Sequence, residues 1–147
     1  WSFVSGRHGL GGRTGWGACS ALIRGAGQMA GLVSSCHAGL SLCRDDAGAS
    51  LLAAMLTKIG EFLASGRPVI VNPGLVDAAG LLERHECGVV FGSAGHLRVG
   101  EAVDQLESLL ADPGTPERCR SLAEVHFNLD RGVDLLVATY ESVGGSR

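Results

Sequence analysis

Apolar residues recur at steps of three and four positions over much of the chain, and this spacing is typical of helices with one buried face. The stretch QMAGLVSSC, residues 28–36, predicts a short helix of this kind. Four longer apolar stripes predict four more helices, the first of which ends near Gly66. In chain order, the stripes are Leu52, Met55, Leu56, Ile59, Phe62 and Leu63; Leu75, Ala79 and Leu82; Val103, Leu106, Leu109 and Leu110; and Leu129, Val133, Leu136, Val137 and Tyr140.

Short apolar runs between these helices predict strands. The stretch HAGLSLC places Ala38, Leu40 and Leu42 on one side of a strand. The run PVIV, residues 68–71, is a continuous β-branched segment of the kind found in buried parallel strands, and GVVF, residues 88–91, predicts another strand. Because strands alternate with helices along the chain, the sequence predicts an α/β fold with a parallel sheet.

A further helix is predicted between the last two apolar stripes. The stretch TPE provides Thr115 as a capping residue and Pro116 at the first helical position. The charged residues of this helix predict a solvated face. These residues are Glu117, Arg118, Arg120 and Glu124.

Residues 1–27 differ from the rest of the chain, because they hold eight glycines and show little periodicity. We expect an irregular Gly/Arg-rich segment, disordered or translated out of frame, followed by one folded domain over residues 28–147. Trp1 and Trp16 beside arginines raise the alternative of a nucleic-acid-binding tail. Residues 1–44 carry only four arginines, so we expect no nucleic-acid partner. Since the first residue is Trp1, we also expect the chain to be a piece of a longer protein.

The composition is typical of a folded protein, and other features of the sequence argue against classes such as membrane-spanning proteins. The chain has 147 residues, of which 46% are apolar and 18% charged, with a formal net charge of −3, as in one compact domain. No apolar run is long enough for a membrane span and no signal peptide is evident, so we expect a cytoplasmic protein. Five cysteines without CxxC spacing predict reduced, mostly core residues. No histidine pair has metal-ligand spacing, and we expect no metal.

Polar residues gather where a ligand site is expected in a parallel sheet, beyond the carboxyl ends of the strands. Arg44 opens the loop RDDAGAS after the strand that ends at Cys43, and the next helix carries Lys58 and Glu61 on its polar face. Lys58 is the only lysine of the chain. Two interpretations are open at this point: a solvated pair at i, i+3, and a pair that faces a ligand.

Three stretches of the sequence resemble a known family. They are TKIGEFLASGRPVIVNPG, LLERHECGVVF and LLADPGTPERCRSLAEVHFNLDRGVDLLVATYESV. In this order they are similar to the C-terminal, donor-binding half of a GT-B glycosyltransferase of the group 1, or family 4, type, from about residue 28 to residue 143. The resemblance implies a Rossmann-like sheet flanked by helices.

The resemblance also implies a function. Members of this family hold a nucleotide-diphosphate sugar between two Rossmann-like domains and transfer the sugar with retention, without a metal. Glu61 matches the glutamate that reaches the donor ribose, whereas Ala53 stands where an E-x7-E motif has its first glutamate. Thr57, Lys58 and Arg44 are the other expected donor-binding residues, with Lys58 beside the diphosphate.

Because the acceptor-binding N-terminal domain would be missing, we expect this chain alone to be inactive. The family often works at a membrane face, so that peripheral membrane contact is compatible with the resemblance. The expected substrate is the nucleotide sugar, and no further cofactor is implied.

A second motif favours a different class of protein. The stretch GAGQMA contains Gly25, Gly27 and Ala30 in the spacing of a dinucleotide-binding fingerprint, and Asp45 and Asp46 follow about 20 residues later. An NAD(P)-binding oxidoreductase fragment is therefore one alternative. A folded remnant without catalytic activity is another. The glycosyltransferase interpretation leads, because its motifs extend over most of the chain.

Overall fold

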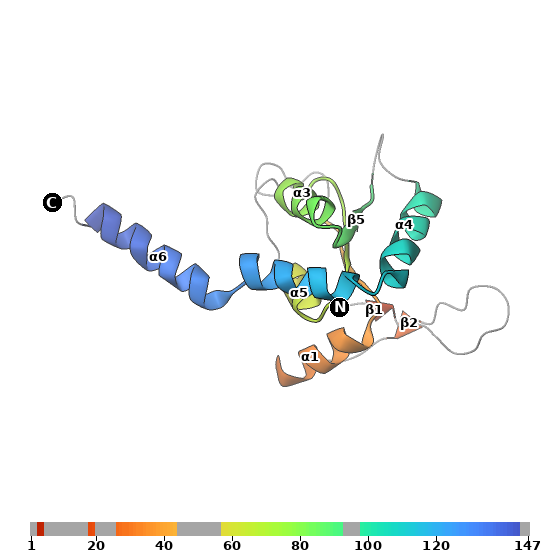
Figure 1. The fold of residues 1–147 in the computed structure, drawn as a ribbon, viewed down its shortest axis with the longest axis horizontal. Helices are drawn as coiled ribbons and strands as arrows, with labels where there is room; N and C mark the ends of the chain where they lie inside the picture. The colour runs from red at the N-terminus through yellow and green to blue at the C-terminus, as the bar shows by residue number, and fades with distance from the viewer. Residues whose placement is uncertain (1–2, 5–17, 20–25, 44–56, 93–97, 145–147) are drawn as a thin grey trace.

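The computed structural model of the chain describes residues 3–4, 18–19, 26–43, 57–92 and 98–144 (Figure 1). The element bounds, in chain order, are β1 (Phe3–Val4), β2 (Ala18–Cys19), α1 (Ala26–Ser35), β3 (Gly39–Ser41), α2 (Thr57–Ala64), β4 (Val69–Val71), α3 (Val76–Arg84), β5 (Gly88–Val90), α4 (Val99–Ala111), α5 (Thr115–His126) and α6 (Leu129–Gly144).

Three of the strands form a parallel sheet in the order β3-β4-β5, with helices between consecutive strands. In this register Leu40 lies beside Ile70, which lies beside Val89. The three strands coincide with the apolar runs that predicted them, and helices flank the sheet (Figure 1). The prediction of an α/β fold with a parallel sheet is therefore confirmed.

The segment of residues 1–27, predicted to be irregular, contains a small amount of regular structure. β1 and β2 pair with each other in an antiparallel two-stranded sheet, with Phe3 opposite Cys19. Helix α1 begins at Ala26, two residues before the predicted boundary. Residues 1–2, 5–17 and 20–25 lie outside the described part of the chain, as do Leu52, Met55 and Leu56 of the predicted apolar stripe.

The main core lies between one face of the sheet and the helices α1, α2, α3 and α5. Successive side chains of β4 point to opposite faces of the sheet. Val69 and Val71 therefore belong to the main core, whereas Ile70 faces the other side. On that other side Val89 packs with residues of α4 in a second, smaller cluster. The largest fully buried residues of the main core are Val33, Ile59, Leu63, Val69, Val71, Leu75 and Leu82.

β3 turns its smaller residues towards the main core. Gly39 lies directly against the ring of Phe62, and a Cβ atom at this position would collide with that ring. The apolar residues Leu40 and Leu42 share one side of the strand, as predicted. However, Leu40 is 53% exposed and Leu42 is 45% exposed. Close packing of α2 on the opposite side explains why the less bulky face is the buried one.

The start of α5 differs from the prediction. Thr115 is the first helical residue rather than the cap, which is Gly114, and no side chain caps this end. Pro116 is consequently the second helical residue rather than the first, and it lies within the first turn. The Thr115 hydroxyl is buried and accepts a hydrogen bond from Nη2 of Arg118 at 2.9 Å. Arg118 is therefore tied into the turn before α5 and is only partly exposed. The other charged residues of the predicted face are exposed as predicted, and they are Glu117, Arg120 and Glu124.

Asp112 is held in the turn between α4 and α5 by two donors. Its Oδ1 accepts the backbone N–H of Gly114 at 2.8 Å, and its Oδ2 lies 2.7 Å from Nη1 of Arg118. The hydrogen bond from Gly114, followed by the hydrogen bond from Arg118, lowers the pKa of Asp112 below its usual value. The ionised carboxylate thus favours the folded chain.

This pKa shift predicts a pH dependence. Because the folded pKa lies below the unfolded one, the contribution is complete above the ordinary aspartate pKa of about 3.9 and is lost as the pH falls through the folded value. We expect Asp112→Asn to lose less stability than the wild type on acidification below about pH 4. Urea midpoints measured across this range test the expectation, with Asp104→Asn on α4 as the control. Parallel profiles for Asp112→Asn and the wild type would contradict it.

α6 has the predicted apolar stripe, but it buries none of its residues. Figure 1 shows α6 extending away from the body that surrounds the sheet. An isolated helix of this length is only marginally stable in water, so its apolar side needs a partner surface. The exposed apolar residues are Leu129, Val133, Leu135, Leu136, Val137, Tyr140 and Val143.

Candidate functional site

α2 connects two parallel neighbours, β3 and β4, and this connection determines its direction. A helix between parallel strands runs antiparallel to them, so its N-terminal part lies at the carboxyl edge of the sheet. Thr57 and Lys58 are therefore near this edge, and Glu61 follows one turn later. At the same edge, Oδ1 of the buried Asn72 accepts the backbone N–H of Cys43 at 2.8 Å and joins the ends of β3 and β4.

α5 packs along α2 in the opposite direction. Near the start of α2, Gly60 lies against the ring of Phe127. A Cβ atom at position 60 would lie 2.5 Å from the Cδ1 atom of this ring. Beyond the end of α2, Gly66 has φ +72° and lies close to Pro116 and Arg120. The C-terminal end of α5 is thus placed beside the carboxyl edge of the sheet, and glycine at position 60 permits the close approach.

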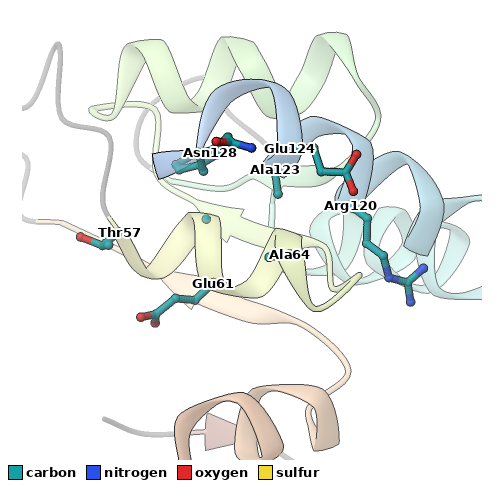
Figure 2. A pocket seen from close by; sticks show the side chains of 9 residues that line it. Thr57, Glu61, Ala64, Arg120, Ala123, Glu124 and Asn128 are labelled. Atoms are coloured by element: carbon teal, nitrogen blue, oxygen red, sulfur yellow. The ribbon is translucent and has the colours of Figure 1, made fainter. Parts of the chain in front are cut away.

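A pocket of about 440 Å³ lies between these two helices (Figure 2). Its volume is within the range of about 300 to 1,000 Å³ that is usual for small-molecule sites. Its floor is formed by small or apolar residues, Gly60, Ala64, Ala123 and Phe127. Its polar residues are Thr57, Glu61, Arg120, Glu124 and Asn128.

The polar side chains are distributed along the length of the pocket (Figure 2). Thr57 and Glu61 project from α2, and Asn128 lies at the C-terminal end of α5. Arg120 and Glu124 come from α5 nearer the other end, with Nη1 of Arg120 3.6 Å from Oε2 of Glu117. The residues near this end carry a hydroxyl, a carboxylate and an amide, which are groups that can bond ligand hydroxyls. The Glu61 carboxylate points away from α5 in Figure 2.

The structure brings together two of the four residues predicted to bind a donor. Thr57 and Glu61 line the same pocket. Lys58 lies between them on α2, is half-buried and is not among the lining residues. Arg44 lies outside the described residues, and so does Ala53.

Three polar residues that line the pocket were not predicted as site residues from the sequence. Arg120 and Glu124 were assigned to a solvated face, and Asn128 was not considered. Their separations of four and eight residues place them on one side of α5 and the turn after it, which is a detectable signal. The sequence does not reveal that this side meets α2, because the contact depends on the packing of Gly60 against Phe127.

Within the described ranges, no group of three or more His, Cys, Asp or Glu residues could hold a metal ion. No helix in the described part of the chain is both long enough and apolar enough to cross a membrane.

The dinucleotide fingerprint falls partly on described residues. Gly27 and Ala30 are in α1, whereas Gly25, Asp45 and Asp46 lie outside the described ranges. The fingerprint requires a strand of the parallel sheet directly before the helix. The described strand before α1 is β2, and β2 pairs with β1 in a separate antiparallel sheet.

Comparisons of the chain with protein-family models, with curated proteins and with solved structures gave no match.

Proposed function

We propose that this chain binds the nucleotide-diphosphate-sugar donor of a retaining glycosyltransferase of GT-B type, with the donor at the α2 end of the pocket between α2 and α5. The observation that carries the proposal is the position of Thr57 and Glu61. Both were selected from the sequence motif, and both line one pocket that begins at the carboxyl edge of a parallel sheet. This edge is where α/β sheets usually bind their ligands.

The chemistry of this end of the pocket suits a nucleotide. The Glu61 side chain is exposed, and its carboxylate can accept hydrogen bonds from both ribose hydroxyls. Hydrogen bonds to an ionised carboxylate are stronger than those to a neutral acceptor. Lys58, on the same turn of α2 but outside the residues that line the pocket, is the proposed positive charge for a diphosphate at the pocket edge. Apolar contacts with the pocket floor would accompany these polar ones.

The proposal includes a second domain that binds the acceptor. Transfer requires the donor and the acceptor to be held in a near-attack geometry, so one domain alone is expected to be inactive. The exposed apolar stripe of α6 supports such a partner, because it provides a surface that the described body of the chain does not cover.

Calorimetric titration tests the donor site. The ligands are uridine, uridine diphosphate, guanosine and guanosine diphosphate, which differ separately in base and in phosphate. We expect Glu61→Gln to weaken binding of the preferred nucleotide by about 1.5 to 3 kcal/mol, roughly 10- to 150-fold, because a charge-assisted acceptor becomes neutral. Glu107→Gln is the matched control, since Glu107 is exposed on α4 and does not line this pocket.

Lys58 variants distinguish the contribution of the diphosphate to binding from that of the nucleoside. Lys58→Ala should weaken a nucleoside diphosphate more than its nucleoside, because only the diphosphate carries phosphate charge. Lys58→Arg should restore part of this difference, since it keeps the charge with another geometry. Equal affinities of the wild type, Glu61→Gln and Lys58→Ala would show that these residues are outside the site. Binding of a nicotinamide dinucleotide but of no nucleoside diphosphate would favour the oxidoreductase alternative.

A further inference from the structure

Two cysteines from distant parts of the chain meet in the main core. Cys87 directly precedes β5, and Cys119 lies in α5; neither is exposed to solvent. Their thiols are hydrogen-bonded to each other. The residues that precede the two cysteines are also in contact. Nη2 of the Arg118 side chain donates to the backbone carbonyl oxygen of Glu86 at 3.4 Å. Both cysteines are free thiols in this structure.

The two thiols have different hydrogen-bond partners. Sγ of Cys87 donates to the carbonyl oxygen of His85 at 3.2 Å, which leaves Cys119 as the donor between the two sulfur atoms. This hydrogen bond, and then the charge of Arg118, lowers the pKa of Cys87 against the opposing effect of burial. The same hydrogen bond and burial raise the pKa of Cys119. Cys87 is therefore the nucleophile of the pair and Cys119 its protonated neighbour.

A surface hollow lies beside the residues that precede the two cysteines in the sequence. It has a volume of about 440 Å³ and lies between the end of α3 and α5, with His85, Glu86 and Arg118 among its lining residues. These residues are the sequence neighbours of the two cysteines. Arg118 directly precedes Cys119, and its side chain, which is 33% exposed, donates to the carbonyl oxygen of Glu86, which directly precedes Cys87. Both thiols are fully buried, so we expect a small oxidant to reach Cys87 through a local movement on this side of the protein.

We propose that Cys87 and Cys119 are a redox modification site, at which hydrogen peroxide closes an intramolecular disulfide between the start of β5 and α5. The Cys87 thiolate attacks one peroxide oxygen and breaks the O–O bond, which gives a sulfenic acid and hydroxide. Sγ of Cys119 then attacks the sulfenic sulfur, and its proton leaves with the hydroxyl group as water. Overall, two thiols are oxidised to one disulfide and one peroxide is reduced to two waters.

The disulfide would fix α5 to the sheet. A covalent link between positions 87 and 119 closes a loop that contains α4 and the turn before α5, and it restricts the unfolded chain. Since α5 also carries Arg120, Ala123 and Glu124 of the pocket beside α2, oxidation would hold one wall of that pocket in place.

Peptide mapping of the full chain after peroxide treatment tests the proposal. Cys87 lies in the tryptic peptide of residues 85–98 and Cys119 in the tryptic dipeptide of residues 119–120, because trypsin cleaves after arginine. We expect these two peptides to be linked, with the loss of two hydrogen atoms, and to separate on reduction with dithiothreitol. The melting temperature of the oxidised chain should rise by on the order of 4 °C or more.

Two variants provide controls. Cys36→Ala, which removes another buried free cysteine, should form the same linked peptide. In Cys119→Ala the sulfenic acid of Cys87 has no resolving thiol and should be trapped by dimedone. The wild-type measurement needs no variant to fold. Oxidation of Cys43 or Cys36 without a link between peptides 85–98 and 119–120 would overturn the proposal.

Discussion

Replacing Gly88 by alanine is expected to lower the free energy of unfolding by about 3 kcal/mol, or to prevent folding. Gly88 begins β5 and pairs with Val69 of β4. A Cβ atom at position 88 would collide with the backbone carbonyl oxygen of Val69 and would also press on the side chain of Leu82, which is fully buried. A backbone atom within a strand pair cannot move aside without loss of the pairing. Urea unfolding followed by circular dichroism measures the effect.

Gly31 is the matched control for this experiment. It lies within α1, and a Cβ atom there would meet nothing within 4 Å. Gly31→Ala should therefore raise the free energy of unfolding by about 0.5 to 1 kcal/mol, because alanine loses less conformational entropy in a helix. If Gly88→Ala were as stable as the wild type, the close pairing of β4 and β5 would be refuted.

The second large effect is expected for Leu63→Ala, at about 2 to 5 kcal/mol of lost stability. Leu63 is 0% exposed and packs in the main core from α2, which carries the candidate site. Its truncation leaves a cavity between α2 and neighbouring elements that are themselves closely packed. The measurement is again the urea midpoint, combined with nucleotide titration, since a loosened α2 would also displace Thr57 and Glu61.

Leu135 provides the contrast for Leu63. It is 70% exposed on α6, and Leu135→Ala should change the free energy of unfolding by less than about 0.5 kcal/mol. Equal losses at the two leucines would mean that α6 packs against the body of the protein in solution. A loss confined to Leu63 would leave the apolar stripe of α6 free for the proposed partner domain.

The elements of this protein could be predicted from the sequence because their signals are local. The β-branched run at residues 68–71 and the apolar spacing at Leu75, Ala79 and Leu82 depend only on neighbours in the chain. The alternation of these patterns was sufficient for an α/β fold with a parallel sheet. Thr57 and Glu61 were likewise selected from one continuous stretch, and one helix carries both.

Side-chain burial was less predictable, since a periodic apolar stripe identifies a face but not what covers it. The stripe of α6 has the same spacing as that of α2, and only the latter is buried. On β3 the apolar side at Leu40 and Leu42 is the more exposed one, because α2 packs against the glycine on the opposite side.

The second wall of the pocket was decided by tertiary structure alone. Arg120, Glu124 and Asn128 reach the site because α5 packs antiparallel to α2, and Gly60 with Phe127 permits the close approach. The meeting of Cys87 with Cys119 has the same origin. Each of these contacts joins residues that are far apart in the sequence, and the spacing of residues within either segment carries no information about the partner. The chain itself determined which helices and strands form, whereas the packing of helices on the sheet determined which of their side chains share a site.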